Sequence, residues 1–354
     1  MKETMKAYVL EGPGRLCFKD VPVPEPRPDE VLIKVMAAGI CGSDIPRICR
    51  TGAHRHPLIP GHEFAGIVER TGSEVSEHWI GKRVGVFPLK PCFSCSCCRK
   101  GQYELCREYD YLGSRCDGGF GEYTAVPEWN LIELPDMVSF EQAAMLEPMA
   151  VAVHNIRRIG LKKEETALVL GLGTIGLCHL LFLMEAGQEQ ILAVGNRALQ
   201  KRLAKEAGLP EEAYMDSKQR DIISWVMEQT GGAGEDASFE CVGRPQTAVA
   251  AVDSLGAGGR AALVGNPSSD ILFPAEVYGK LLRKQLTVKG SWNSSFCHHR
   301  EDDWHYVLER VSQNRVAPQR LITHRLPFEE LEKGICIMRD KTEEYVKIML
   351  MGNE

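Results

Sequence analysis

The sequence predicts an α/β protein of two domains, a β-rich domain and a domain built on a doubly wound parallel sheet. The chain has 354 residues, more than the roughly 250 to 300 at which one hydrophobic core stops growing. Short branched apolar runs between prolines and glycines fill its first part, whereas strand-like and helix-like runs alternate from Thr166 onward. Because such alternation is typical of βαβ units, helices are expected on both faces of the second sheet.

Composition and charge argue against a polyanionic partner. Lys and Arg number 42, Asp and Glu number 48, and the net charge of −6 comes without a long run of either sign. We therefore expect no nucleic-acid surface and no anionic-membrane surface. The 13 cysteines lie in a long chain whose first six residues are not an apolar signal segment, so reduced thiols and a cytoplasmic location are expected.

The β-rich domain is expected to hold a metal site. Strand-like runs at residues 6 to 36, 64 to 68 and 83 to 87 flank a stretch that begins with Cys41 and ends with His62 and Glu63. Thiolate, imidazole and carboxylate are the ligand types that hold a catalytic zinc while one position stays open. The alternative is a buried thiol and an ordinary polar turn.

A second metal site is predicted in residues 92 to 106, where four cysteines follow a Cys-x2-Cys-x2-Cys-x7-Cys pattern. The four are Cys92, Cys95, Cys98 and Cys106. Four thiolates close a tetrahedron and leave no open position, so a zinc here would be structural. Free or disulfide-bonded thiols and an iron–sulfur cluster are the alternatives, and the adjacent Cys97 makes the register ambiguous.

Glu147 is a further candidate ligand. Residues 118 to 123 predict a tight turn into a strand, and residues 146 to 154 predict the start of a helix in which Glu147 directly precedes Pro148. A carboxylate at such a position is often only a partner of the helix dipole. It becomes a metal-ligand candidate because Cys41, His62 and Glu63 need a partner.

The second domain opens with a dinucleotide-binding pattern. Residues 167 to 184 carry no formal charge and approach the length of a membrane helix, about 18 residues, but glycines divide the run. The order is a buried strand, then Gly171-Leu-Gly173-Thr174-Ile175-Gly176, then an apolar helix. Glycines in this context permit a tight turn and seat a pyrophosphate on the helix N-terminus.

The cofactor preference is expected from the residues that follow the next strand, at positions 191 to 194. About 20 residues beyond the glycine turn, an acidic residue normally holds the ribose 2′-hydroxyl of NAD. Here the sequence reads Gly195-Asn196-Arg197, without Asp or Glu. Gly leaves room, Asn can donate and Arg can pair with a 2′-phosphate, so NADP is favoured over NAD. The alternative is an Arg197 that stacks on adenine or points to solvent.

Later segments complete the pattern. Strands are expected at residues 237 to 240, 261 to 264 and 286 to 289, with helices between them. Helices at 302 to 313 and 328 to 339 carry charged faces that predict packing on the first domain rather than extension of the sheet.

Taken in order, these motifs resemble the zinc-containing medium-chain dehydrogenase/reductase family over nearly the whole chain. The similarity covers the words at 41 to 44, 61 to 63, 146 to 148 and 171 to 176 together with the four-cysteine segment. Residues 41 to 47, 52 to 54, 113 to 120 and 282 to 292 are similar to a polyol-phosphate branch of that family. One departure is Gly195, where the branch usually carries Asp.

The resemblance implies a GroES-like catalytic domain from residues 1–153 and 293–354 and a Rossmann domain from residues 154–292. It implies a catalytic zinc on Cys41, His62 and Glu147, with Glu63 as an alternative or exchanging ligand. Asp44 would orient His62, and Ser43 would start a proton relay. A homo-oligomer, dimer or tetramer, is implied as well.

The expected function is a zinc-dependent hydride transfer between a polyol phosphate and NAD(P). A phosphate needs cations near the metal, and Arg47, His54 and Arg115 are the candidates because they lie in flanking loops. Free polyols, L-threonine or secondary alcohols are alternative substrates. A zinc-independent quinone reductase or a non-catalytic cofactor-binding regulator is the alternative of a different class.

Overall fold

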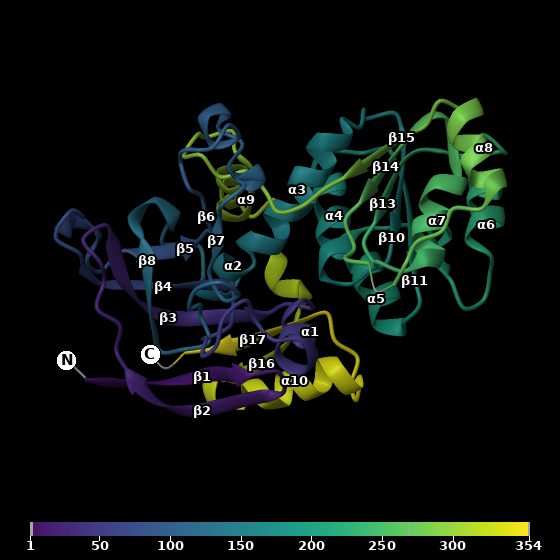
Figure 1. Ribbon diagram of the computed structural model, residues 1–354. Helices are drawn as coiled ribbons and strands as arrows, with labels where there is room; N and C mark the ends of the chain where they lie inside the picture. Colours follow the sequence, from purple (N-terminus) through teal and green to yellow (C-terminus); the bar gives the residue numbers. More distant parts are fainter. Residues whose placement is uncertain (1–2, 268, 353–354) are drawn as a thin grey trace. The chain divides into compact units, whose positions relative to one another are not determined.

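The computed structural model describes residues 3–267 and 269–352. The chain forms two compact units, one made of Met1–Glu147 with Ser295–Glu354 and the other of Pro148–Ser294. Each unit has its own main sheet (Figure 1).

The first unit is built on a seven-stranded sheet with the order β16-β17-β3-β4-β5-β9, in which β8 pairs with β3. Two further pairs, β1 with β2 and β6 with β7, form small two-stranded sheets. The strands of the whole unit are β1 (Thr4–Gly12), β2 (Arg15–Pro22), β3 (Glu30–Ile40), β4 (Glu63–Thr71), β5 (Arg83–Val86), β6 (Leu89–Lys90), β7 (Asp110–Tyr111), β8 (Tyr123–Pro127), β9 (Leu131–Glu133), β16 (Ile322–Pro327) and β17 (Lys347–Met351). Its helices are α1 (Asp44–Pro46), α2 (Phe140–Ala144), α9 (Asp303–Ser312) and α10 (Leu331–Asp340), and α3 (Leu146–Ile159) begins at its end.

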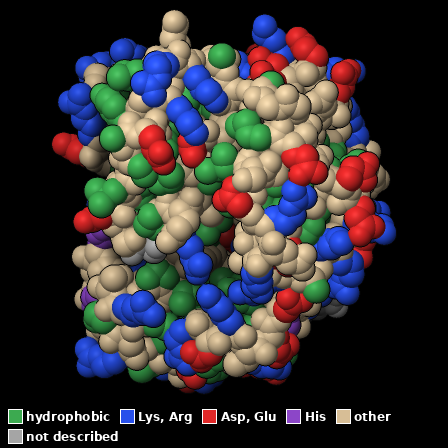
Figure 2. Space-filling view, turned by 90° about the vertical axis from the view of Figure 1, so that its right-hand side faces the viewer, with side chains coloured by type: hydrophobic (Ala, Val, Ile, Leu, Met, Phe, Trp, Pro, Cys, Tyr) green, Lys and Arg blue, Asp and Glu red, His purple; other side chains and the backbone are tan. Residues whose placement is uncertain are grey.

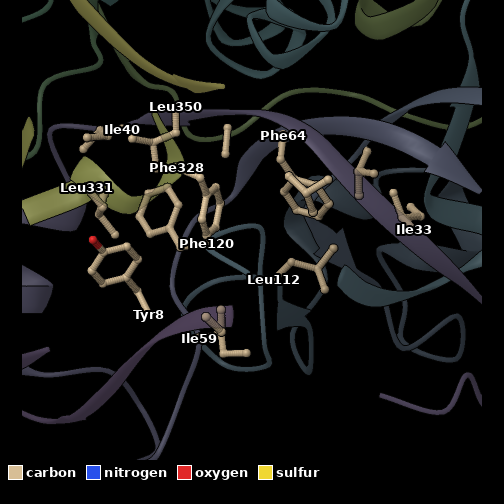
Figure 3. Packing of buried hydrophobic residues seen from close by; sticks show 14 of the residues in the cluster. Tyr8, Ile33, Ile40, Ile59, Phe64, Leu112, Phe120, Phe328, Leu331 and Leu350 are labelled. Atoms are coloured by element: carbon tan, nitrogen blue, oxygen red, sulfur yellow. The ribbon is translucent and has the colours of Figure 1, made fainter. Parts of the chain in front are cut away.

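The carboxyl-terminal segment completes the core of this unit. Figure 3 shows Phe328, Leu331 and Leu350 in one cluster with Tyr8 and Phe120 from the other end of the chain. All five side chains are at most 6 % exposed, and the Tyr8 hydroxyl donates to the carbonyl of Glu329. Burying these apolar side chains stabilises the pairing of β17 with β3.

The second unit is a six-stranded parallel sheet with the order β12-β11-β10-β13-β14-β15. Its elements are β10 (Thr166–Leu170), α4 (Thr174–Glu185), β11 (Gln190–Gly195), α5 (Ala198–Ala207), β12 (Tyr214–Asp216), α6 (Ile222–Gln229), β13 (Glu235–Glu240), α7 (Pro245–Asp253), β14 (Leu255–Leu263), α8 (Ala275–Arg283) and β15 (Thr287–Gly290). Helices α4 and α5 pack together, and α6, α7 and α8 form a second group (Figure 1). The strand order reverses between β10 and β13, which is where open α/β sheets bind ligands.

The predicted fold class is confirmed, and the elements missed are short or at the chain end. The uncharged run at 167 to 184 divides into β10 and α4 as expected, and no described helix is long and apolar enough to cross a membrane. Strand β12 has three residues, and β16 and β17 were not predicted. Their pairing depends on distant partners, which a local pattern does not reveal.

Candidate metal and cofactor sites

A candidate metal group forms where β3 ends and β4 begins. Cys41 follows Ile40 directly, and the antiparallel pairing of Gly39 with Glu63 brings the start of β4 beside it. One ligand atom each of Cys41, His62 and Glu63 lies within 4.8 Å of the others. A Cβ at Gly39 would lie 2.3 Å from Glu63 Oε2, so this arrangement needs glycine at position 39.

The carboxylate of Asp44 lies against the His62 imidazole of this group. It is fully buried, accepts from the Cys41 amide at 3.0 Å and from Arg47 at 2.7 Å, and lies 3.4 Å from His62 Nδ1. The contact with Nδ1 is electrostatic and not aligned as a hydrogen bond. Burial alone would lower the pKa of His62, but Asp44 and then Cys41 outweigh it and raise this pKa well above its usual value. Nδ1 therefore faces Asp44, as in carboxylate–histidine–metal arrangements.

Lys347 is a partner of the group that the sequence reasoning missed. It begins β17, is 2 % exposed, donates to the Ile40 carbonyl at 3.2 Å and pairs with Glu63 Oε2. Burial lowers and Glu63 raises the pKa of Lys347, with a net increase. The sequence did contain a signal for it, because Lys347 is the single charged residue inside the apolar run from Val346 to Met351.

Glu147 lies beside the group rather than in it. Its carboxylate is buried and accepts from the Tyr111 hydroxyl at 3.3 Å. Burial raises the pKa of Glu147 to about 7; His62 opposes this and Glu63 adds to it. The ring of Tyr111 also meets His62 edge-on at 5.8 Å, so Tyr111 is a second neighbour that the sequence reasoning did not identify.

Ser43 and the three candidate phosphate-binding cations lie around the same segment. The Ser43 hydroxyl donates to Cys41 Sγ at 3.3 Å. The pKa of His54 is lowered by burial first and then by the positive charges of Arg115 and Arg47, so both arginines lie near enough to act on the imidazole electrostatically and to favour its neutral form. The Arg115 guanidinium stacks 4.6 Å above the Tyr109 ring.

The four predicted cysteines form a second group, with one ligand atom each of Cys92, Cys95, Cys98 and Cys106 within 4.8 Å of the others. Measured sulfur–sulfur distances are 3.5 Å from Cys95 to Cys98 and 3.9 Å from Cys92 to Cys98. A tetrahedron with metal–sulfur bonds of about 2.3 Å has edges of about 3.8 Å. All 13 cysteines are free thiols, and Cys97 lies outside the group.

Two features lower thiol pKa values at the edge of this group. The Ser94 hydroxyl and nearby amides lower the pKa of Cys92 to about 6, and amides lower that of Cys95 to about 7. Burial raises the pKa of Cys98 to about 12. A cysteine must be deprotonated to bind a metal. A bound cation would supply the positive charge that stabilises the Cys98 thiolate.

In the second unit the glycine turn joins β10 to α4 at the switch point of the sheet. Gly171 has φ +90°, and a Cβ on it would lie 2.2 Å from Val242 Cγ2. A Cβ on Gly176 would lie 1.8 Å from the Gly171 carbonyl oxygen. Gly173 is the N-cap of α4 and makes no side-chain cap, and Thr174 and Ile175 begin the first turn of this helix, whose N-terminal dipole end favours an anion.

Asn196 and Arg197 follow β11, and Arg197 lines a cavity of about 500 Å³. Arg197, Lys201, Tyr214, Asp216 and Arg220 are among its lining residues. A Cβ at Gly195 would lie 2.7 Å from the Tyr214 hydroxyl, and the Asn196 amide donates to Gln200 at 2.9 Å. A larger side chain at position 195 therefore collides with Tyr214.

Two stretches of the chain match known protein families. Residues 27–136 match the alcohol dehydrogenase GroES-like domain, and residues 174–313 match the zinc-binding dehydrogenase family. The galactitol 1-phosphate 5-dehydrogenase of Escherichia coli K12 is 32 % identical over 94 % of this chain and 95 % of its own. The sorbitol dehydrogenase of Bacillus subtilis is 33 % identical over 99 % and 98 %.

Solved structures agree with these matches. The galactitol-1-phosphate dehydrogenase of Escherichia coli superposes with a TM-score of 0.90 at 32 % identity, over 98 % of this chain and 100 % of the other. A zinc-binding dehydrogenase of Sinorhizobium meliloti, solved with NADP, superposes with a TM-score of 0.89 at 28 % identity, over 99 % and 100 %.

Proposed function

The chain belongs to the zinc-binding alcohol dehydrogenase family, and we propose that it interconverts a polyol phosphate of the galactitol 1-phosphate type and the corresponding ketose phosphate, with NADP as the hydride acceptor and NADPH as the donor. The observation that carries this proposal is the cationic group around Arg47, which contacts Asp44 and through it the candidate metal group. Its neighbours His54 and Arg115 add two more donors suited to a phosphate.

Cys41, His62 and an acidic residue would hold the catalytic zinc. Their ligand types and mutual distances fit a tetrahedral site with an open position, and Glu63 is better placed than Glu147 to be the acidic ligand. Bound zinc would act as a Lewis acid on the substrate hydroxyl, and bound NADP would accept the hydride.

The surrounding side chains of this chain have separable roles in that proposal. Asp44 fixes the orientation of His62, and Lys347 holds Glu63 in place. Ser43 Oγ, now donating to Cys41, is the group that would receive the substrate's proton and pass it on. Cys92, Cys95, Cys98 and Cys106 would hold a second, structural zinc.

The residues after β11 support NADP. Gly195 brings no carboxylate to repel a 2′-phosphate, and the adjoining cavity is lined by three cationic residues, Arg197, Lys201 and Arg220, against two acidic ones, Glu212 and Asp216. Arg197 lies two residues beyond the end of β11, in the segment where the ribose-binding residue is expected, and is therefore the residue to test. We expect Arg197→Ala to raise the NADP KM about tenfold or more and to change the NAD KM little. Equal changes for both cofactors would contradict this assignment.

The substrate assignment is tested by steady-state kinetics with galactitol 1-phosphate and sorbitol, each with NAD and NADP. The proposal expects a much higher kcat/KM for the phosphate. Arg115→Ala should raise the KM of galactitol 1-phosphate about tenfold and leave that of sorbitol unchanged. Arg50→Ala, an exposed arginine in the same segment as Arg47, is the matched control and should change neither.

Arg47→Ala is a second test with a broader expected effect. Because Arg47 donates to Asp44 at 2.7 Å, its loss should raise the KM of the phosphate and also disturb His62. An equal rise of the KM for sorbitol and galactitol 1-phosphate in both arginine variants would refute a phosphate site.

A free-polyol dehydrogenase is the second candidate function. The similarity to a sorbitol dehydrogenase over nearly the full chain supports it. A higher kcat/KM for sorbitol than for galactitol 1-phosphate would select this function.

We also propose a cytoplasmic homo-oligomer that assembles through the outer strand β15 and helix α8. Apolar side chains are exposed along this part of the second unit, at Leu272, Tyr278, Leu282, Val288 and Trp292. Figure 2 shows apolar side chains grouped among mixed charges on the side where α6 and α8 lie. We expect Leu282→Glu to reduce the sedimentation coefficient to that of a monomer, whereas Met137→Glu, at an exposed site in the first unit, should not.

A further inference from the structure

A buried carboxylate stands at the switch point of the parallel sheet, one strand away from the glycine turn. Glu240 is the last residue of β13, pairs in register with Leu170 at the end of β10, and is 1 % exposed. A buried charged group is costly unless its oxygens are satisfied by donors. Its contacts therefore indicate what the residue is for.

The donors to Glu240 all come from the loop and helix that follow it. Oε1 accepts from the amides of Val242 and Gly243 at 2.9 and 3.0 Å and from the Thr247 hydroxyl at 2.7 Å. Oε2 accepts from the Gly243 amide at 3.1 Å. The carboxylate thus fixes the 241–244 loop and the first turn of α7 to the end of β13.

This loop forms one wall of the glycine turn. The Cys241 amide donates to the Leu170 carbonyl at 2.9 Å, and Val242 lies against Gly171, where a Cβ would be 2.2 Å from its Cγ2. Gly243 has φ +75°, and a Cβ on it would lie 1.9 Å from the Asn266 carbonyl oxygen, so the loop fits tightly on its other side too. Val242 itself is 38 % exposed, so part of its side chain remains accessible beside Gly171.

We propose that Glu240 is a positioning residue for the dinucleotide: it holds the 241–244 loop so that Val242 forms a fixed apolar wall beside the phosphate-binding glycine turn. This inference rests on the proposed cofactor site. Without the carboxylate, two amides and one hydroxyl lose a charge-assisted acceptor, and the wall must be ordered when the cofactor binds. The cost then appears in cofactor affinity.

The test compares two buried glutamates of the same strand. Glu240→Ala removes all of these bonds, and Glu240→Gln retains an acceptor oxygen for the donors that meet Oε1. Glu235→Ala, at the opposite end of β13, removes a buried carboxylate that accepts from Ser254 at 2.7 Å and is the matched control. The readouts are the NADPH dissociation constant by fluorescence titration, amide hydrogen exchange of residues 241 to 247, and the unfolding midpoint.

We expect Glu240→Ala to raise the NADPH dissociation constant about tenfold or more and to speed exchange at Val242 and Gly243, with Glu240→Gln intermediate. Glu235→Ala should lower the unfolding midpoint and leave NADPH binding within about twofold. Unchanged NADPH binding in a folded Glu240→Ala protein would overturn the inference, and so would an equal loss in Glu235→Ala. If Glu240→Ala does not fold, Glu240→Gln decides by the same two measurements.

Failure of the proposed function gives a different pattern. The unaltered protein would then bind neither NADPH nor NADH, and the role of Glu240 would fall with the cofactor site. If the unaltered protein binds NADPH and the Glu240 variants bind it equally well, only the role of Glu240 is refuted.

Discussion

Replacing Lys347 by Met is predicted to destabilise the first unit through the carboxylate it leaves behind. Lys347 and Glu63 have side chains 2 % and 1 % exposed, so water does not reach the pair. Removing one partner of such a pair costs about 3 to 5 kcal/mol because the other charge stays buried and uncompensated. The free energy of unfolding in urea, followed by far-ultraviolet circular dichroism, should fall by about that amount in metal-stripped protein.

Two comparisons separate this cause from loss of packing. In the double variant Lys347→Met with Glu63→Gln no charge remains, so most of the loss should be recovered, and the coupling energy between the sites should be large. Lys333→Met removes an exposed lysine that pairs with Glu330 and should cost less than about 1 kcal/mol.

Zinc binding provides a second test of the same prediction. If Glu63 binds the catalytic metal, the cation replaces the lost positive charge, and Lys347→Met should cost less with zinc than without it. A cost below about 1 kcal/mol in metal-stripped protein, or a double variant no more stable than the single one, would refute the reasoning.

Two further predictions concern groups outside the catalytic centre. Burial raises the pKa of Glu235 from 4.5 to about 7, so its protonated form favours the fold; the associated stability is complete below about pH 4.5 and lost as pH rises through 7. Glu235→Gln should therefore be more stable than the parent at pH 8 by about 3 kcal/mol and should lack this alkaline loss, and parallel pH profiles of the two proteins would contradict it. Cys95→Ser should lower the zinc content from two to one per chain and alter Trp129 fluorescence, because the neighbouring Phe93 packs on that ring at 5.1 Å. Cys97→Ser, outside the sulfur group, should keep both zinc ions; equal zinc loss in the two variants would show that the register is wrong.

The candidate ligands could be predicted because metal chemistry limits the residue types and the chain places them at informative spacings. The four sulfurs of the second group lie within 15 residues, and His62 and Glu63 are adjacent. The spacing of Lys347 from Glu63 carried no comparable information, because the two residues lie 284 positions apart and meet only through the pairing of β17 with β3. Tyr111 likewise reaches Glu147 only once the sheet has formed.

Gly195 illustrates how an expectation drawn from the local sequence can leave out a packing constraint. The sequence favours NADP there because a carboxylate is missing, which treats position 195 as space that a phosphate can use. In the fold, a Cβ at position 195 would lie 2.7 Å from the Tyr214 hydroxyl oxygen, which is too close for an undisturbed contact. Position 195 is therefore constrained by packing as well as by charge. Gly195→Asp therefore changes two things at once, because the new side chain brings a carboxylate and also requires the Tyr214 side chain to move.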